Sequence, residues 1–338
     1  MRPPAFWNAG PGHPAARALA PLAALYGRRS AARMDRVGAG APCPVVCVGN
    51  FTLGGAGKTP TALALAGRLR DLGASPAFLT RGYGGRLAGP VRVDPDRHGA
   101  ADTGDEPLLL ARHAPTIVAR DRVAGARLCV EAGAGVIVMD DGLQNPTLAK
   151  DLSLAVVDAG AGLGNGRVFP AGPLRVPLAR QWPHVHGLVL VGDGAAGESV
   201  AEAAVRRGVP VHRARLVPGG DWAGRRVLAF AGIGRPEKMF ATLREAGAEV
   251  VATRAFPDHH PYGGTELGAL AAEAGRLGAE LVTTHKDHVR LPPDFAARVA
   301  VLPVTLEFHD VGALAAQLAA ALGRLSGAPA RNCPWPGA

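Results

Sequence analysis

Residue types that hold and transfer phosphate gather in one short segment, Val48–Pro60, which reads Val-Gly-Asn-Phe-Thr-Leu-Gly-Gly-Ala-Gly-Lys-Thr-Pro. The segment follows an apolar run and leads into a helical pattern. A strand, a glycine-rich turn, Lys-Thr and a helix form the layout of a P-loop, which surrounds nucleotide phosphates with backbone N–H groups. We predict that Lys58 reaches the β- and γ-phosphates and that the Thr59 hydroxyl binds Mg²⁺. The predicted nucleotide-binding residues of this loop are Thr52, Leu53, Gly54, Gly55, Ala56, Gly57, Lys58 and Thr59.

The loop departs from the usual motif at its first position, where Thr52 stands in place of a glycine. The chain has 46 glycines, so a Gly-Lys-Thr triplet could arise by chance. Its place between a buried strand and a helix argues against chance. Lysine is also rare, because it occurs only at positions 58, 150, 238 and 286, and a lysine in this loop therefore favours a function.

Two carboxylates, Asp140 and Asp141, follow a second apolar strand pattern at 135–139. In P-loop proteins an acidic residue at the end of a neighbouring strand approaches the metal beside the phosphates. We predict that Asp140 holds Mg²⁺, directly or through water. Asp141 could bind the metal, a water or a basic neighbour. The plainer alternative is that two aspartates after a strand start a turn.

Asp105 and Glu106 lie in the segment Thr103–Pro107, which opens a short apolar helix. Acidic residues are favourable in a first helical turn, and proline suits its start. Two carboxylates on a loop could equally supply a proton acceptor and a metal ligand. Spacing alone leaves both interpretations open.

Asp258, His259 and His260 follow an apolar strand pattern in the second half of the chain. Together they could form a carboxylate-oriented imidazole or part of a metal site. No third ligand at helical spacing supports zinc, so we favour an acid/base or phosphate-contact role.

Cations and one aromatic residue lie on other loops next to strand patterns. Arg81 and Tyr83 share a glycine-rich turn, Arg120 and Arg122 open a helix, and Arg175 ends a Gly-Pro-Leu-Arg loop. A single arginine is more often a solvated surface group. Several arginines around a phosphate site could neutralise charge on a transferring phosphoryl group.

The composition describes a folded chain of one large or two medium domains, with 338 residues, 48% hydrophobic and 19% charged. The net charge of +9 fits acidic partners such as nucleotides, phospholipid head groups or nucleic acid, although arginine-rich composition explains part of it. The four cysteines form no C-x-x-C pair and favour a reduced, cytosolic-side protein. They are Cys43, Cys47, Cys129 and Cys333.

Short apolar strands alternate with helical stretches along most of the chain, which predicts a mostly parallel α/β sheet with helices on both faces. Ligands of such sheets bind beyond the carboxyl ends of the strands, where the polar residues above fall. Strands are predicted at 44–48, 76–80, 135–139, 153–157, 187–191, 226–230, 280–284 and 299–304. Helices are predicted at 58–72, 106–112, 121–132, 197–207, 236–247, 264–277 and 310–324.

A cluster of glycine and proline at 208–225 predicts a break between two units. We predict four parts: an N-terminal membrane-associating helix at 1–35, a P-loop core domain at 36–215, a smaller α/β domain at 216–328 and a frayed tail at 329–338.

The N-terminal helix pattern combines an apolar face with arginines. It is far too short to span a bilayer, which needs ~20 apolar residues. It could lie on anionic lipid or pack against the body of the protein, and the pattern leaves both open. The apolar residues are Leu19, Leu22, Leu25 and Tyr26, and the arginines nearby are Arg17, Arg28, Arg29 and Arg33.

Taken in order, these motifs resemble the tetraacyldisaccharide 4′-kinase family. The resemblance covers almost the whole chain, from the N-terminal helix through V-G-N-x-x-x-G-G-x-G-K-T-P, T-R-G-Y-G, G-D-E-P, M-D-D-G-x-Q, F-P-x-G-P-L-R, F-x-D-H-H and T-H-K-D. It implies a P-loop core with a smaller C-terminal α/β domain, and transfer of the γ-phosphate of ATP, with Mg²⁺, to the 4′-hydroxyl of a tetraacyldisaccharide 1-phosphate. The product would be lipid IVA in lipid A (lipopolysaccharide) biosynthesis. The implied partners are this acylated glucosamine disaccharide phosphate and the lipid of the inner membrane at its cytoplasmic face, with no nucleic acid.

The resemblance also implies roles for matching residues. Asp105 would accept the hydroxyl proton, His259 would orient Asp105, and Lys58 would neutralise developing charge. The implied metal-sphere groups are Thr59, Glu106 and Asp140. The implied nucleotide and substrate contacts are Tyr83, Arg122, Asp141, Gln144 and Arg175. Two positions depart from the family pattern, since His285 and Val176 stand where glutamate is usual.

Two rival functions remain at this stage. A P-loop GTPase switch or metallochaperone would need an N/T-K-x-D box to read the base, and the nearest match is His285-Lys-Asp287, with no intervening residue. A soluble kinase or ligase of a small polar acceptor would have no use for the basic and apolar N-terminal helix.

Overall fold

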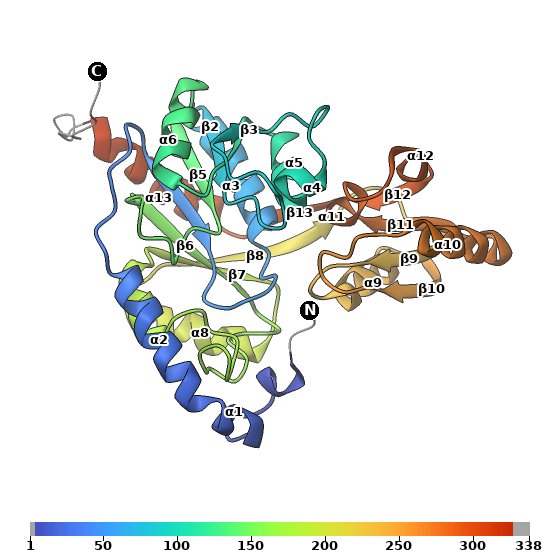
Figure 1. Cartoon of the computed structure of the whole chain (residues 1–338), viewed down its shortest axis with the longest axis horizontal. Helices are drawn as coiled ribbons and strands as arrows, with labels where there is room; N and C mark the ends of the chain where they lie inside the picture. The colour runs from blue at the N-terminus through green and yellow to red at the C-terminus, as the bar shows by residue number, and fades with distance from the viewer. Residues whose placement is uncertain (1–3, 327–338) are drawn as a thin grey trace.

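The computed structural model describes residues 4–326, which fold around two β-sheets of nine and four strands (Figure 1). The larger sheet has the order β13-β8-β7-β6-β1-β5-β2-β4-β3, and only its two edge pairs, β13–β8 and β4–β3, are antiparallel. The smaller sheet, β10-β9-β11-β12, is parallel. The mostly parallel α/β fold predicted from the sequence is confirmed.

The strands of the larger sheet are β1 (Val45–Gly49), β2 (Pro76–Thr80), β3 (Val91–Arg92), β4 (Thr116–Val118), β5 (Val136–Asp140), β6 (Leu152–Asp158), β7 (Gly187–Val191), β8 (Val211–Pro218) and β13 (Val304–Phe308). Those of the smaller sheet are β9 (Arg226–Ala231), β10 (Glu249–Ala255), β11 (Glu280–Thr284) and β12 (Val299–Leu302). The α-helices are α1 (Pro14–Ala18), α2 (Ala20–Met34), α3 (Lys58–Asp71), α4 (Ala100–Thr103), α5 (Asp105–Ala111), α6 (Arg122–Glu131), α7 (Leu178–Gln181), α8 (Ala195–Val205), α9 (Pro236–Glu245), α10 (Gly264–Leu277), α11 (His285–His288), α12 (Pro293–Ala296) and α13 (Val311–Ser326), with 3-10 turns at Ala5–Trp7 and Trp182–His184.

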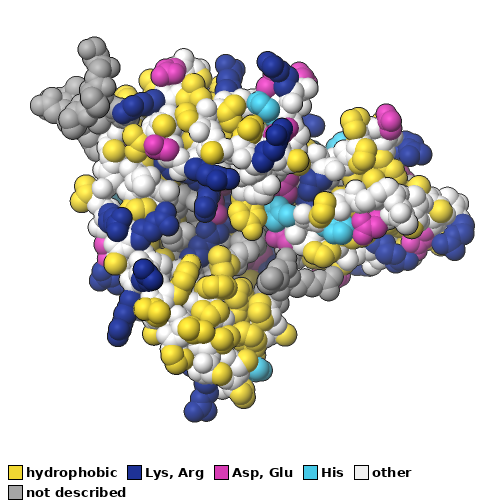
Figure 2. All heavy atoms as spheres, viewed as in Figure 1, with side chains coloured by type: hydrophobic (Ala, Val, Ile, Leu, Met, Phe, Trp, Pro, Cys, Tyr) yellow, Lys and Arg dark blue, Asp and Glu magenta, His cyan; other side chains and the backbone are white. Residues whose placement is uncertain are grey.

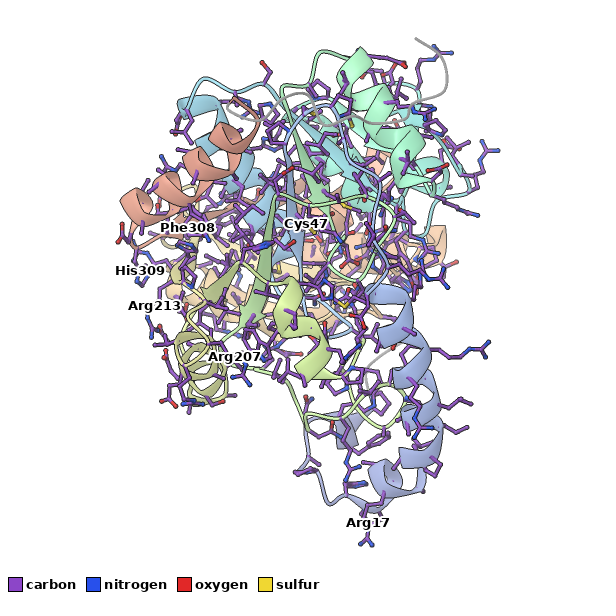
Figure 3. The ribbon with its side chains drawn as sticks, turned by 90° about the vertical axis from the view of Figure 1, so that its left-hand side faces the viewer. Arg17, Cys47, Arg207, Arg213, Phe308 and His309 are labelled. Carbon is purple, nitrogen blue, oxygen red and sulfur yellow. The ribbon has the colours of Figure 1, made fainter. Side chains whose placement is uncertain are left out.

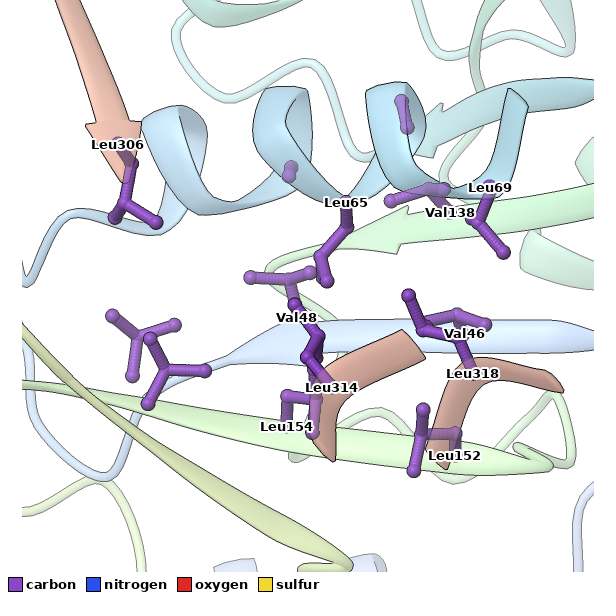
Figure 4. Close-up of a cluster of buried hydrophobic side chains, with 14 of the residues drawn as sticks. Val46, Val48, Leu65, Leu69, Val138, Leu152, Leu154, Leu306, Leu314 and Leu318 are labelled. Atoms are coloured by element: carbon purple, nitrogen blue, oxygen red, sulfur yellow. The ribbon is translucent and has the colours of Figure 1, made fainter. Parts of the chain in front are cut away.

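Strand β1 is buried in the middle of the larger sheet because helices cover both of its faces. Its side chains alternate, so Val46 and Val48 point to one face and Cys47 to the other, within the interior (Figure 3). On the first face the strand packs against leucines of α3 and α13, namely Leu65, Leu69, Leu314 and Leu318 (Figure 4). Burying one such leucine contributes ~1.5–3 kcal/mol. This core fixes the carboxyl ends of β1 and its neighbours, where the polar residues lie.

The predicted break at 208–225 is wrong in its first half, where β8 forms eight residues of strand. Two buried side chains, His212 and Ala214, alternate with exposed arginines that pair with glutamates of α8 and β13. An amphipathic strand near a sheet edge needs few apolar residues. The flanking prolines and glycines therefore hid it in the sequence.

The predicted strand 299–304 is two strands that belong to different sheets. Pro303 separates them, and its missing N–H prevents a continuous ladder. After it, β13 pairs with β8, and α13 packs on the larger sheet. These contacts favour a smaller unit of residues 226–302 (hereafter the small unit) over the predicted 216–328.

Helices α1 and α2 project from the body of the molecule, with Arg17 at their outer end (Figures 1 and 3). One face of α2 is buried through small residues and Met34, and Asp35 at its end pairs with Arg180 and His184. Within residues 4–326, no helix has the length and apolar character needed to cross a bilayer. The predicted tail at 329–338, with Cys333, lies outside the described residues.

Candidate active site

The P-loop follows β1 as predicted, and α3 begins at Lys58. Gly54 and Gly57 have φ angles of 102° and 90°, a region that only glycine adopts readily. Thr52 forms an extended bridge with Leu174 instead, so the first position of the loop requires no glycine. Lys58 folds back over the loop, with Nζ 3.5 Å from the Gly54 carbonyl oxygen.

Asp140 lies next to the P-loop because β5 pairs with β1 in register, Val48 opposite Asp140. Its side chain is 1% exposed, and neither carboxylate oxygen has a hydrogen-bond partner among the described residues. Burial, with the nearby charges of Glu106 and Asp141, raises the pKa of Asp140 to about 7. A buried, unpaired carboxylate is costly unless a cation meets it.

Residues 4–326 contain no group of three or more His, Cys, Asp or Glu side chains that could hold a metal by themselves. Mg²⁺ needs no such group, because it is usually bound by one or two carboxylates together with phosphate oxygens and water. The orphaned oxygens of Asp140, with Glu106 and the Thr59 hydroxyl, therefore fit Mg²⁺ held beside nucleotide phosphates.

Asp141 differs from its neighbour because cations surround it. Its carboxylate lies 3.0 Å from Arg175 Nη1 and 3.7 Å from Lys58 Nζ. Burial alone would raise the pKa of Asp141, but these cations outweigh it and lower the pKa. Arg175 Nε also donates to the Thr52 carbonyl oxygen at 2.9 Å, so Asp141 and Arg175 brace the P-loop from outside.

Asp105 and His259 form a pair across the two units. Asp105 opens α5, is 3% exposed, and accepts a hydrogen bond from His259 Nδ1 at 3.0 Å. Burial alone would raise the pKa of Asp105, but the bond to His259 and the charges of Lys286, His259 and Arg290 lower it to about 2. The carboxylate is therefore ionised at neutral pH.

The backbone at the site is unusual at two positions. Among the described residues, Asp141 and His259 are the non-glycine residues with a left-handed φ, at 52° and 57°. Such conformations cost of order 1–3 kcal/mol and cluster at functional sites. Asp258, by contrast, lies 3.8 Å from His259 Nε2, and His260 pairs with Glu266 at 2.9 Å, so the carboxylate that orients His259 is Asp105.

The other predicted residues lie around the same cleft. Tyr83 is largely exposed, with its ring 5.4 Å from that of His259. Arg122 is 2% exposed, its Nε has no partner among residues 4–326, and burial lowers its pKa to about 10. Gln144 donates to the Asn50 carbonyl oxygen at 2.7 Å, so it supports the start of the loop.

The cleft itself has a volume of about 2280 Å³. Its polar wall comprises Thr52–Thr59, Tyr83, Glu106, Arg122, Asp141, Gln144, Arg175 and His259. Its apolar wall includes Phe6, Trp7, Leu19 and Phe169. Asp105 and Asp140 are buried and do not belong to this lining. The cleft can therefore take a ligand that is charged at one end and apolar at the other.

Sequence reasoning missed the cations that the small unit brings to α5. Lys286 Nζ lies 2.8 Å from Glu106 Oε1, and Arg290 Nε lies 3.3 Å from Asp105 Oδ2. The scarcity of lysine was a signal for Lys286. Of the two departures, Val176 is buried in an apolar cluster and His285 lines the cleft, where burial and Arg112 lower its pKa.

Comparison with known proteins decides between the functions that this cleft could serve. A model of the family described as tetraacyldisaccharide-1-P 4′-kinase matches residues 15–323. The chain belongs to this family. A tetraacyldisaccharide 4′-kinase of Methylobacterium radiotolerans is 71% identical over 96% of this chain and 99% of its own length. Another family member, from Nitrobacter winogradskyi, is 55% identical over 93% of this chain and 96% of its own length.

A solved structure of LpxK from Aquifex aeolicus in complex with ATP has the same fold. It matches with a TM-score of 0.72 and 24% identity, covering 91% of this chain and 99% of the other. The agreement over nearly the full length of both chains extends to the small unit.

Proposed function

We propose that this protein transfers the γ-phosphate of ATP to the 4′-hydroxyl of a tetraacyldisaccharide 1-phosphate, the reaction of its family. The observation that carries the proposal is the hydrogen bond between Asp105 and His259 at the same cleft as the P-loop. The cleft also joins a phosphate-binding wall to an apolar wall, as an acylated sugar phosphate requires.

The P-loop backbone and Lys58 hold the β- and γ-phosphates, and Lys58 neutralises charge as the bond to the leaving group breaks. Asp140, Glu106 and Thr59 would hold Mg²⁺, and that ion would supply further neutralisation of the phosphate charge. Arg122 and Arg175 lie on the phosphate and substrate side. The Asp141–Arg175 brace keeps the loop in place during transfer.

Asp105 receives the proton of the attacking hydroxyl. A carboxylate with a pKa of about 2 is a weak base, so its first task is to accept a hydrogen bond and orient the oxygen in line with the phosphorus. In a loose transition state the hydroxyl loses its proton late, when it has become acidic enough for such a base. His259 donates from Nδ1 and fixes the orientation of Asp105.

The GTPase alternative is not favoured. Asp287, which would have to read a guanine base, is fully buried and bound to Arg290 at 3.0 Å and to the Tyr262 hydroxyl at 2.7 Å. None of its oxygens is available to a nucleotide base. The Thr284–Asp287 turn is therefore structural.

The protein lies on the membrane surface through its N-terminal helices. Leu22, Leu25 and Tyr26 are 58%, 59% and 40% exposed on α2, next to exposed arginines. Hydrophobic side chains gather over the lower lobe of the molecule, where α1 and α2 lie (Figure 2). Pelleting with anionic vesicles tests this: we expect Leu22→Glu with Leu25→Glu to abolish binding, and Leu72→Glu, an exposed leucine of the core domain, to leave it unchanged.

The test of the function is incubation of the purified protein with ATP, Mg²⁺ and a tetraacyldisaccharide 1-phosphate, followed by mass analysis. We expect a gain of one phosphate that is absent with Lys58→Ala and strongly reduced with Asp105→Ala. Arg276→Ala, on the exposed side of α10, is the control that keeps full activity. Absence of product from the wild type, with the lipid dispersed in detergent, would contradict the proposal.

A further inference from the structure

Arg290 joins both members of the Asp105–His259 pair. Its Nε lies 3.3 Å from Asp105 Oδ2, the oxygen that also accepts from His259. Its Nη1 donates to the carbonyl oxygen of His260 at 3.1 Å, directly after His259 in the chain. Its Nη2 donates to the Gly232 carbonyl oxygen at 3.1 Å, which also accepts from the His259 backbone N–H.

The guanidinium is itself held rigidly. The Arg290 side chain is 7% exposed, and Asp287, which is fully buried, binds Arg290 Nη2 at 3.0 Å. Asp287 is fixed in turn by the Gly232 backbone N–H at 2.8 Å and the Tyr262 hydroxyl at 2.7 Å. Arg290 Nε also donates to the Lys286 carbonyl oxygen at 2.9 Å. A planar group held by two carboxylates and three carbonyl oxygens has a single orientation.

Arg290 contacts one carboxylate from each unit. Asp287 and Arg290 come from the small unit, and Asp105 comes from α5 of the larger one. Removing Arg290 would leave Asp105 with the hydrogen bond from His259 and the charge of Lys286, whose Nζ pairs with Glu106 at 2.8 Å. Asp105 would then lose the group that fixes its position relative to the His259 loop.

We propose that Arg290 is a positioning residue for phosphoryl transfer: it fixes Asp105 Oδ2 and the loop of His259 in one arrangement across the two units. The inference rests on the proposed function. This positioning role does not require Arg290 to contact ATP. It also assigns the small unit a share in the geometry of the reaction beyond the supply of His259.

The test compares Arg290→Met, Arg290→Lys and the control Arg298→Met in the full-length protein, with ATP, Mg²⁺ and tetraacyldisaccharide 1-phosphate. Misplacement of a reacting group by about 1 Å costs about 10²-fold, so we expect kcat of Arg290→Met to fall by about 10²-fold. KM for ATP stays within about twofold, because the P-loop is untouched. Arg290→Lys is intermediate, and the exposed Arg298→Met equals the wild type.

A double variant separates positioning from general stability. If Arg290 acts through Asp105, then adding Arg290→Met to Asp105→Asn lowers kcat by less than about threefold more. A merely structural arginine would give the full additional loss, and that result overturns the inference. Wild-type kcat in Arg290→Met, or in Arg290→Lys should the Met variant not fold, overturns it as well. Failure of the wild type to phosphorylate the lipid would instead count against the proposed function.

Discussion

Two carboxylates of the larger unit, Asp105 and Asp158, meet cations of the small unit, and their surroundings differ. Asp105 faces Arg290, whose side chain is 7% exposed. Asp158, at the end of β6, pairs with Arg235 at 2.8 Å and with Lys238, which are 42% and 44% exposed. Water and salt therefore reach the cations of the second contact but not that of the first.

The difference shows that one interface can combine a buried contact with an exposed one. A buried charged network is costly to break, because each group left behind is unpaired. Exposed ion pairs contribute ~0–1 kcal/mol and are screened by salt. The exposed contact also lies near the P-loop. Gly234, next to Arg235 in the chain, is so close to the loop that a Cβ atom on it would lie 3.6 Å from the Gly55 backbone nitrogen. The Asp158 contact is therefore the weaker of the two contacts between the units.

The largest effect that this comparison predicts is on the chemistry. Asp105→Asn keeps the shape of the side chain but removes the proton acceptor, so we expect kcat to fall by about 10²–10⁴-fold. Asp158→Asn, the matched change at the exposed contact, should change kcat by less than about threefold. Steady-state kinetics with saturating ATP checks both, and equal losses would remove the distinction between the contacts.

The pH dependence of stability gives a second, smaller difference. The pKa of Asp105 is about 2 in the folded protein against a usual 3.8, so its ionised form stabilises the fold by about 2 kcal/mol above pH 5. This contribution is lost as the pH falls towards 2, with about half gone by pH 3. Urea unfolding in EDTA should show that Asp105→Asn loses less stability than the wild type between pH 6 and pH 3. Parallel curves for the two proteins would show that the buried contact is not linked to folding.

The smallest effect is expected at the exposed contact. Burial alone would raise the pKa of Asp158, but Lys238 and Arg235 outweigh the effect of burial and lower this pKa. Because both cations are well exposed, Asp158→Asn should reduce the free energy of unfolding by less than about 1 kcal/mol at low salt. In 0.5 M NaCl the variant and the wild type should coincide. A difference in the free energy of unfolding that does not change with salt would mean that the Asp158 contact is as shielded from solvent as the Asp105 contact.

Local pattern predicted the parts of the site that one segment can specify. The P-loop needs a strand, a glycine turn and a helix in sequence, and residues 44–72 contain all three. Asp140 was predictable because strand ends of a parallel sheet share one edge. Arg175 was predicted as one of several loop cations around the phosphate site, and Gln144 was implied by the family resemblance. Neither prediction showed that these side chains brace the backbone of the loop.

Contacts between residues far apart in the sequence could not be predicted from local sequence patterns. Asp105 and His259 are 154 positions apart, and only packing of the small unit on α5 brings them together. Arg290 gave no signal, because a buried arginine and a surface arginine look alike in a sequence. Strand β8 was missed for a related reason. Its arginines form ion pairs with glutamates of α8 and β13, and these partners are distant in the sequence.

The pairing of β8 with β13 has a mechanical consequence. The chain leaves the larger sheet after Pro218 and returns at Val304, and these two residues are opposite each other in the antiparallel pair. The backbone bond from Gly219 N–H to the Pro303 carbonyl oxygen, at 2.8 Å, extends this pairing by one step. The small unit is thus joined to the larger sheet by two backbone segments that run side by side and are paired with each other. Two paired segments constrain the direction in which the small unit leaves the sheet more than a single linker would, and this helps to set where His259 lies beside Asp105.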